Sequence, residues 1–413
     1  MQTPLSASLN QRVVLNLAIL VNILSIGSFM MVMPMGPDFS LALGMPAEHT
    51  GYLAGGATFA AALIGFLCAP FLDKFDRKQV LVSCLSLKFL LILCCAFATS
   101  PWQLITLFVL SACFSGPAGG VLMAAILDVT PVAYRGRAMA MMASGFSIAA
   151  IIAVPMTLEL VARLNWQTAF YGFGGLGLLL VAVLQWRFPS LTAHQSAAQH
   201  NNVPAQLITN PAFRFACAIA AVQMFGHFLL IPHFSSYFQF NLGFARNSIS
   251  SLYLFGGLAS LLALQLSGRL LDKGHGLALI WSMSLLAALV VIIGLVFGAM
   301  LSVYAFFIIF MAASTVRSSS TSALLSSIPA PYQRAAYMSY QATVANIASG
   351  LGALCSALWL STNNAQQLQG LEQLAVLAAL CLLCAPVLVH ITVKRFLAPC
   401  DQSQATHSLA TND

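Results

Sequence analysis

The stretch FLDKFDRKQV, residues 71–80, places five charged side chains within six positions. The sequence on both sides is almost entirely apolar, reading GGATFAAALIGFLCAP before it and LVSCLSLKFLLILCCAFA after it. Of the 413 residues in the chain, 60% are hydrophobic and 7% are charged, whereas about a quarter are charged in an ordinary soluble domain. A charged turn between two long apolar runs therefore indicates a loop at the surface of a membrane.

Apolar runs long enough to cross a bilayer recur along the whole chain. A transmembrane helix needs about 20 mostly apolar residues, and short polar segments separate twelve runs of roughly that length. We therefore expect an all-α membrane protein with twelve transmembrane helices. The expected spans are residues 13–35, 51–72, 80–98, 103–127, 138–162, 168–186, 215–238, 249–271, 277–297, 303–326, 335–360 and 374–397.

The chain has few of the residue patterns that hold metals or cofactors. Its ten cysteines lie mostly inside the apolar runs, and the CLLC sequence at 381–384 has no companion ligand within its run. Such cysteines are typical of small buried hydrophobic residues. The phosphate-binding pattern G-x-x-x-x-G-K-[ST] does not occur. We expect no metal, no cofactor and no catalytic residue.

The basic residues indicate the orientation of the chain. If the N-terminus is cytoplasmic, the opposite side of the membrane carries only Arg163 and Arg246. This bias matches the positive-inside rule and predicts that both termini are cytoplasmic. It also explains the net charge of +7 without a nucleic-acid partner. The turns on the cytoplasmic side hold Arg12, Lys74, Arg77, Lys78, Arg135, Arg137, Arg187, Arg214, Lys273, Arg334, Lys394 and Arg395.

The two halves of the sequence resemble each other. Asp73 and Asp272 occupy equivalent places in APFLDKFDRK and GRLLDKGHG, and Arg135 and Arg334 in TPVAYRGRA and IPAPYQRAA. Both pairs are separated by the same offset, since 272 − 73 = 199 and 334 − 135 = 199. The chain is therefore interpreted as a tandem repeat of six spans. The expected parts are an N-terminal half at 1–188, a cytoplasmic linker at 189–210, a C-terminal half at 211–397 and a cytoplasmic tail at 398–413.

The charged turn resembles the signature of the major facilitator superfamily (MFS), G-x-x-x-D-[RK]-x-G-[RK]-[RK]. Asp73, Lys74, Arg77 and Lys78 match it, whereas Ala69 and Asp76 stand in its two glycine positions. The sequences DVTPVAYRGRAMAM and LNWQTAFYGFGG are also similar to turns of bacterial members. The resemblance implies two pseudo-symmetric six-helix halves that rock about a midplane site. It is strongest to bacterial drug and sugar efflux members, which implies a bacterial inner membrane.

The same resemblance implies that the charged turns form a gate. Asp73 would engage the start of helix eleven near Ala335, and Arg77 would pair with Asp128. Breaking such contacts would let the halves rock apart, although the basic residues could serve membrane topology alone. The expected gate residues are Asp73, Lys74, Arg77, Asp128, Arg135, Asp272 and Lys273.

Arg317 is the first candidate for solute binding. It lies 12 residues before Pro329 and 14 after Val303, which places it near the middle of the tenth span. An ionisable group at that depth needs a partner or a wet cavity, and its fork of donors suits a carboxylate or phosphate. An anionic or zwitterionic solute is one interpretation. A structural role, bonded to the hydroxyls of 318–322, is the other.

Further polar residues lie in spans that line the central cavity of this fold or in the eleventh span. They could bind a neutral ligand, but contacts between helices give the same pattern. Lys88 lies in a span that is peripheral in the fold, where we expect it to reach towards the membrane surface or pair locally. The remaining candidates for solute binding are Gln223, His227, Asn22, Gln341 and Asn346.

Three residues are candidates for proton coupling. Glu159 and Asp38 lie towards the outer side, where burial would raise the pKa of a carboxyl. His227 lies near midplane and belongs to the residue type that titrates near neutral pH. Since helices one and four carry no deep acid, proton coupling is only one alternative.

The sequence therefore predicts a monomeric secondary transporter that moves a small organic solute, and the resemblance favours export with proton antiport as one mode. Import or symport of an anionic or zwitterionic metabolite is the alternative. A membrane enzyme is disfavoured because the eight histidines are scattered, and a nutrient sensor would bind its ligand without moving it. The expected partners are the solute, protons and the lipid bilayer.

Overall fold

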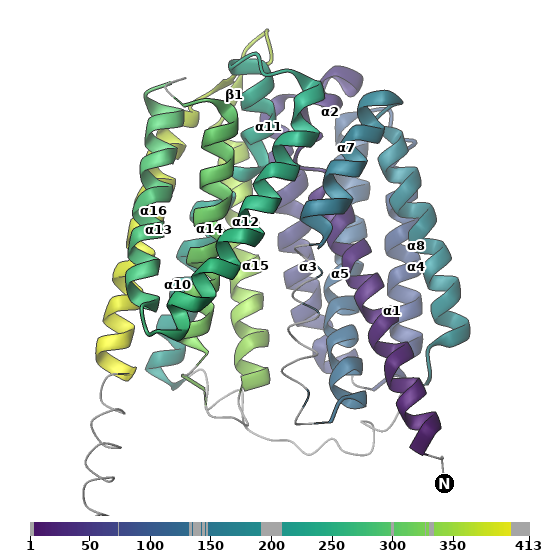
Figure 1. The fold of residues 1–413 in the computed structure, drawn as a ribbon. Helices are drawn as coiled ribbons and strands as arrows, with labels where there is room; N and C mark the ends of the chain where they lie inside the picture. Colours follow the sequence, from purple (N-terminus) through teal and green to yellow (C-terminus); the bar gives the residue numbers. More distant parts are fainter. Residues whose placement is uncertain are drawn as a thin grey trace, which may run out of the picture. The chain divides into compact units, whose positions relative to one another are not determined.

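The computed structural model describes residues 4–72, 74–131, 134, 142, 145, 148–190, 209–298, 301–326, 328–329 and 334–397. Almost all of them are helical (Figure 1). The chain divides into two compact units. Unit 1 comprises Met1–Gln199, Ile231–Gly257 and Ala353–Gly370, and unit 2 comprises His200–Leu230, Leu258–Gly352 and Leu371–Asp413.

Unit 1 is built on five long helices from the first half of the sequence. These are α1 (Pro4–Met30), α3 (Thr50–Leu72), α4 (Arg77–Cys95), α5 (Pro101–Val129) and α8 (Gln167–Arg187). Four short segments connect or continue them: α2 (Gly36–Leu43), the 3₁₀ turn η1 (Ala47–His49), the π-helical η3 (Ala149–Ala153) and α7 (Val154–Arg163).

Unit 1 also contains short segments from the second half of the sequence. They are η5 (Ile231–His233), α11 (Phe234–Ser236), η6 (Tyr237–Asn241), η7 (Arg246–Ser248), the beginning of α12 (Ile249–Asp272) and the end of α15 (Arg334–Trp359). Strands β1 (Ser361–Thr362) and β2 (Leu368–Gln369) pair antiparallel, with Ser361 opposite Gln369.

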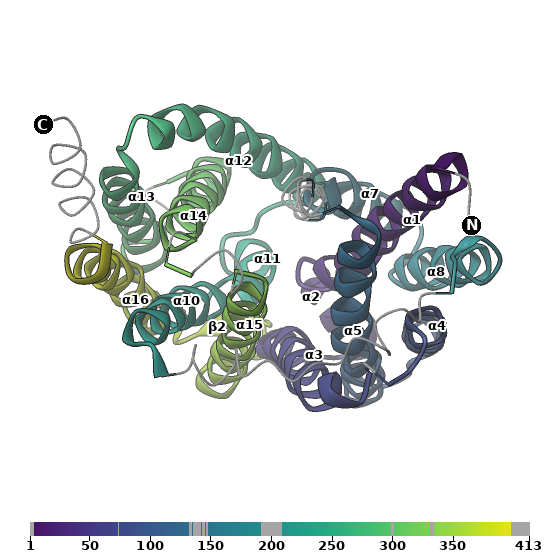
Figure 2. The same ribbon diagram turned by 90° about the horizontal axis from the view of Figure 1, so that it is seen from below.

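Small residues let helices of unit 1 approach closely. Helix α5 packs against α3 and α4, and α4 packs against α8 (Figure 2). At the α3–α5 crossing, a Cβ on Gly116 would overlap the carbonyl oxygen of Ala61 and would lie 3.0 Å from the Cα of Gly65. Membrane helices associate largely through such close packing. The absence of a side chain at Gly116 therefore sets the separation of α3 and α5.

Unit 2 contains the other long helices. They are α10 (Pro211–Phe228), α13 (Gly276–Val291) with the π-helical η8 (Ile292–Val296), α14 (Val303–Leu325), α16 (Leu371–Thr392) with the π-helical η10 (Val393–Leu397), and the larger parts of α12 and α15. Helix α16 packs on α10 and α13, and α13 packs on α14 (Figure 2). One buried cluster of unit 2 joins Phe213, Ile280, Leu325, Tyr337 and Val389.

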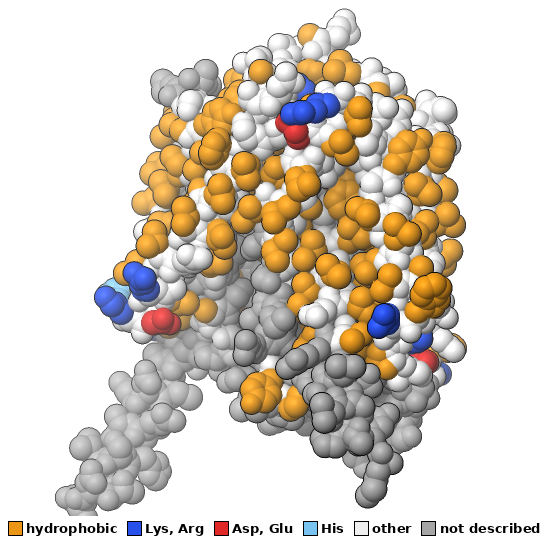
Figure 3. Space-filling model, turned by 45° about the vertical axis from the view of Figure 1, so that its right-hand side comes forward, with side chains coloured by type: hydrophobic (Ala, Val, Ile, Leu, Met, Phe, Trp, Pro, Cys, Tyr) orange, Lys and Arg blue, Asp and Glu red, His pale blue; other side chains and the backbone are white. Residues whose placement is uncertain are grey.

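The expected all-α membrane fold is confirmed. Eleven helices among the described residues are long and apolar enough to cross a membrane. The fifth expected span, 138–162, lies partly outside the described residues. On the face shown in Figure 3, hydrophobic side chains are spread over the described surface, and charged side chains lie only near the top and the bottom of the view. Such a surface suits contact with lipid.

The seventh expected span, 215–238, lies within one candidate span at Pro211–Asn241. That span is not one regular α-helix, because α10 ends at Phe228 and short segments with other helical geometries follow. Pro232 explains the break, because proline lacks a backbone N–H and disfavours helical geometry in the residue before it.

Candidate functional site

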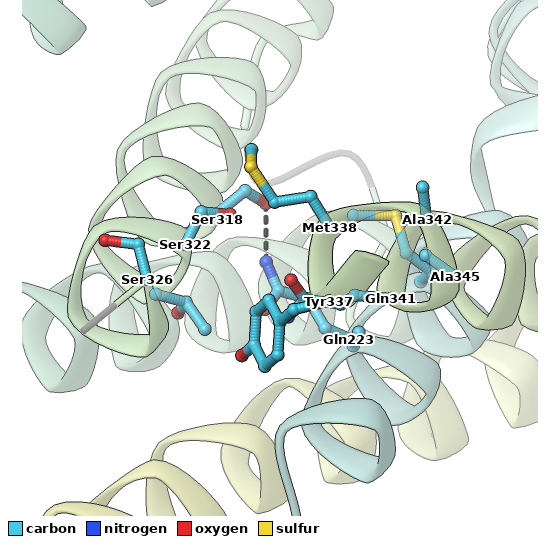
Figure 4. Close-up of a pocket in the computed structure, with 12 residues that line it drawn as sticks. Gln223, Ser318, Ser322, Ser326, Tyr337, Met338, Gln341, Ala342 and Ala345 are labelled. Atoms are coloured by element: carbon cyan, nitrogen blue, oxygen red, sulfur yellow. Dashed lines mark hydrogen bonds between the residues drawn. The ribbon is translucent and has the colours of Figure 1, made fainter. Parts of the chain in front are cut away.

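A cavity of about 250 Å³ lies in unit 2 between α10, α14 and α15 (Figure 4). The side chain of Gln223 donates a hydrogen bond from Nε2 to Oγ of Ser318, 2.5 Å away, and joins α10 to α14. Gln341 of α15 also lines the cavity. The polar lining consists of Gln223, Ser318, Thr321, Ser322, Tyr337 and Gln341, with Ser326 at one end.

The polar lining follows from the hydroxyl-rich run at 318–322. In an α-helix, residues four apart share a face, so Ser318 and Ser322 both reach the cavity. Met224 and Met338 supply flexible apolar surface to the same lining. This mixture of a few hydrogen-bonding groups and adaptable apolar side chains is typical of sites for small organic molecules. Two of the predicted solute-binding residues, Gln223 and Gln341, are brought together here.

Arg317 is deeply buried, with 1% of its surface exposed. Its Nε and Nη1 make no hydrogen bond to any residue that the structure describes. The backbone oxygen of Arg317 accepts a bond from Thr321 Oγ1 at 2.8 Å, but the side chain does not bond to the hydroxyl run. Arg317 does not line the cavity, although the next residue, Ser318, does.

His227 lies one turn along α10 from Gln223. Its ring stacks on Phe310 of α14, with centroids 5.4 Å apart and planes at 11°. Nδ1 is buried without a partner among the described residues. His227 therefore packs against α14 and keeps one ring nitrogen without a hydrogen bond to the described residues.

The other two predicted solute-binding residues lie elsewhere. Asn22 of unit 1 donates a hydrogen bond from Nδ2 to the backbone oxygen of Met142, 2.7 Å away. Asn346 lies on α15 with an exposed side chain, outside the lining of the cavity. The hydrogen bond of Asn22 to Met142 gives this polar residue a packing role between helices.

The structure describes part of the charged turn at residues 71–80. Nε of Arg77 lies 2.6 Å from Oδ2 of Asp128, the pair that the resemblance implied. The ammonium group of Lys74 lies 5.6 Å from the centre of the Phe71 ring. Asp272 is the last residue of α12, Lys273 follows it, and both are exposed. Asp73, Arg135 and the side chain of Ala335 lie outside what the structure describes.

Asp76 has a structural role that the signature did not indicate. It is the N-cap of α4, and its Oδ1 accepts a bond from the backbone N–H of Lys78 at 3.0 Å. Its Oδ2 accepts a bond from the hydroxyl of Ser190 at 2.6 Å. Aspartate is a favoured N-cap residue. An aspartate directly before a helical run was therefore a signal in the sequence that could have predicted this role.

Asp38 forms a bidentate ion pair with Arg246 in unit 1. Its two carboxylate oxygens accept bonds from Nε at 2.8 Å and Nη2 at 2.9 Å. Burial raises the pKa of Asp38 above its ordinary value, and the hydrogen bond and charge of Arg246 offset part of the rise. The partner of Asp38 was not predicted, because it lies 208 residues away in the sequence.

Three more contacts join segments of unit 1 near α2, α11 and β1, which lie at one end of the unit (Figure 1). Ser235 donates a hydrogen bond to the backbone oxygen of Pro34 at 2.7 Å. Asn241 exchanges two bonds with the backbone of Leu368, at 2.9 and 3.0 Å. Thr362 bonds to the carboxylate of Glu48. We call these contacts and the Asp38–Arg246 pair the α2–η7 contact set. All of them except the Asn241–Leu368 contact join segments from different halves of the sequence.

Glu159 is more exposed than a buried proton carrier would be, whereas Lys88 is buried. Glu159 is half exposed and pairs with Arg163 one turn later at 2.7 Å, while its other oxygen accepts a bond from Ser250. Lys88 is buried, and its Nζ donates to the backbone oxygen of Ser25 at 3.3 Å. Of the two alternatives expected for Lys88, the structure therefore shows local pairing and not a side chain that reaches the membrane surface.

Known proteins resemble the chain in sequence and in fold. It is 27% identical over 213 residues to a gallate transporter of Pseudomonas putida, covering 50% of this chain and 45% of the relative. It is 24% identical to the purine ribonucleoside efflux pump NepI of Escherichia coli O157:H7, covering 60% of this chain and 61% of the pump. The matches thus span about half to three fifths of these relatives.

The fold agrees with a crystal structure of a bacterial homologue of the human lysosomal transporter Spinster in an inward-facing, occupied conformation. The TM-score is 0.74 at 16% identity, covering 93% of this chain and 97% of that one. The sequence pattern of the Major Facilitator Superfamily matches residues 18–353, which is most of the chain. The chain therefore belongs to the Major Facilitator Superfamily of membrane transporters.

Proposed function

We propose that the protein is a secondary transporter that exports a small organic solute by alternating access, with the cavity of unit 2 as part of its solute site. The observation that carries this proposal is the cavity between α10, α14 and α15, whose mainly apolar lining holds a few hydrogen-bonding groups and the Gln223–Ser318 bond. In the family's fold, solute sites lie near the bilayer midplane. Gln223, Gln341 and Ser318 would bind hydroxyl or amide groups of the solute.

The relatives favour export over import. The NepI pump is an efflux protein by name, whereas the name of the gallate transporter gives no direction. Export is therefore the proposal, and import of an anionic or zwitterionic metabolite is its alternative. We further propose a bacterial inner membrane and a monomeric protein. We also propose cytoplasmic termini, which the distribution of basic residues supports.

Alternating access needs a gate on each side of the solute site. We propose that the charged turns at Asp73 and Asp272 close the cytoplasmic side, with Arg77 and Asp128 as one pair. The α2–η7 contact set would close the outer side. Asp38 is the proposed proton carrier, because its carboxyl is buried and that of Glu159 is half exposed.

Untargeted comparison of metabolites in cells and medium tests the function and its direction. The protein is overproduced beside an Asp73→Asn variant that is inserted to the same level. Export predicts a compound that is enriched in the medium and depleted in the cells. The reverse distribution would make the protein an importer, and no difference between the two strains would refute transport of cellular metabolites.

Gln223→Leu should lower transport of that compound about tenfold, because a buried hydroxyl or amide of the solute would lose its hydrogen-bonding partner. The matched control is Thr343→Val on α15, whose hydroxyl bonds to the backbone of its own helix at Ser339. Initial rates in cells with equal amounts of protein provide the measurement. Equal rates for both variants would place the solute elsewhere.

The proposed cytoplasmic pair can be tested by exchanging its charges. Asp128→Arg should reduce transport severely, because it places a second guanidinium beside Arg77. The double variant Arg77→Asp with Asp128→Arg restores opposite charges and should recover part of the rate. If the double variant transports no faster than Asp128→Arg alone, the pairing of the two charges does not matter for transport.

A further inference from the structure

We infer that Arg317, Ser314 and His227 form a buried subsite for a carboxylate group, so that the transported solute is a small organic monocarboxylate. This inference rests on the proposed transport function and names its class of solute. We call these three residues the carboxylate subsite.

The three residues come from two adjoining helices at one depth. Phe310, Ser314 and Arg317 are spaced at i, i+4 and i+7 on α14, which places them on one face. The stacking of His227 on Phe310 directs that face towards α10. Since long helical side chains lean towards the helix N-terminus, the guanidinium of Arg317 extends towards Ser314.

Each member of the subsite has hydrogen-bonding capacity that the described chain does not use. The unbonded buried atoms are Nε and Nη1 of Arg317, Oγ of Ser314 and Nδ1 of His227. Ser314 is 5% exposed and Arg317 is 1% exposed. Buried polar atoms are rarely left unpaired in proteins. Guanidinium N–H groups form strong hydrogen bonds to carboxylate oxygens, so Nε and Nη1 can each donate one such bond.

The chain supplies no acidic side chain to neutralise Arg317 in unit 2. The sequence has no Asp or Glu between Glu159 and Asp272, and none between Asp272 and Glu372. Helices α10, α13, α14 and α15 are therefore free of acids along their whole length. Asp272 and Glu372 lie at helix ends. A buried cation without a counter-ion is strongly disfavoured, so a negative charge from outside the chain would be bound there.

The charge count favours a single carboxylate over a phosphate. Arg317 is the one Lys or Arg in α14, and the basic residue of α10, Arg214, is exposed in its first turn. A dianion would leave one negative charge unbalanced. The cavity begins one residue away along α14, at Ser318, and one turn away along α10, at Gln223. The carboxylate would occupy the subsite while hydroxyl or amide groups of the same solute reach Gln223 and Gln341.

The stability of the solute-free protein tests the subsite without knowledge of the solute. Arg317→Gln removes an uncompensated buried charge and should raise the Tm of the purified protein by about 3 °C or more. Arg317→Lys retains the charge and should not raise it. Arg214→Gln, at an exposed arginine of α10, is the matched control and should leave Tm unchanged. A Tm of Arg317→Gln below that of wild type would overturn the inference, because it would mean that the chain itself satisfies Arg317.

Transport provides the second readout, with the metabolite pool of the cell as the probe. The compounds that wild type redistributes between cells and medium should carry one carboxylate, and Arg317→Gln should reduce their redistribution about 100-fold. Redistribution of neutral or cationic compounds alone, or of carboxylates equally well by Arg317→Gln, would refute the subsite while leaving the transport function intact. No redistribution by wild type would refute the transport function and the inference with it.

Discussion

Gly116→Ala should prevent α3 and α5 from packing and should sharply lower the amount of folded protein. The added Cβ would overlap the carbonyl oxygen of Ala61 and lie 3.0 Å from the Cα of Gly65. Both neighbours are backbone atoms, so no side chain can rotate away. Overpacking at such a site costs about 3 kcal/mol, and the helices would have to separate along their whole contact.

The same helix supplies the controls for this prediction. Gly119 and Gly120 lie within one turn of Gly116, and a Cβ at either would meet no atom within 4 Å. Gly119→Ala and Gly120→Ala should therefore keep the wild-type yield and Tm, measured by size-exclusion chromatography of heated samples. A wild-type Tm for Gly116→Ala would contradict the α3–α5 packing described above.

Asp38→Asn should lower transport at least tenfold. The substitution leaves a partly buried Arg246 without its bidentate partner, since the two side chains are 16% and 22% exposed. Loss of one member of such a pair costs about 2 kcal/mol. This changes the equilibrium constant between the states that make and lack the contact by about 30-fold. Glu159→Gln is the matched control, because its pair with Arg163 is exposed and such pairs contribute little.

A double variant separates the two roles proposed for Asp38. Asp38→Asn with Arg246→Gln removes both charges, so a contact that only closes the outer side should recover solute exchange across liposomes. Accumulation driven by a proton gradient should stay lost if Asp38 carries the proton. Recovery of both activities would remove Asp38 from proton coupling, and recovery of neither would mean that the charged pair itself is needed for the structure.

The sequence predicted the membrane fold well because apolar span length and charge placement are local signals. It could not predict which helices touch. The pairing of Asp38 with Arg246 joins residues 208 positions apart, and no periodicity indicates such a partner. The end of α10 could have been predicted from the sequence, since Pro232 disfavours a continuous helix. The contact of Gly116 with Ala61 needs the crossing geometry of two helices, which a single sequence does not contain.

The candidate site was predicted in part. Burial depth singled out Arg317, and its span also contained Ser318 and Ser314 as part of an ordinary polar pattern. That Gln223 bonds to Ser318 while Arg317 stays unbonded depends on the rotation of α14 about its axis. Asn22 shows the reverse case, because its bond to Met142 satisfies a polar group that resembled a ligand-binding residue. Polarity alone does not separate a binding residue from a packing residue.

Solute counterflow into liposomes that contain only the purified protein tests the central claim, that this chain moves a small organic solute by itself. Liposomes are preloaded with the unlabelled compound identified from the medium, and uptake of the labelled compound is followed over time. We expect transient accumulation with wild type, a rate about tenfold lower for Gln223→Leu and a wild-type rate for Thr343→Val. Binding of the compound to the purified protein without any counterflow would contradict transport and would make the chain a sensor that binds its ligand without moving it.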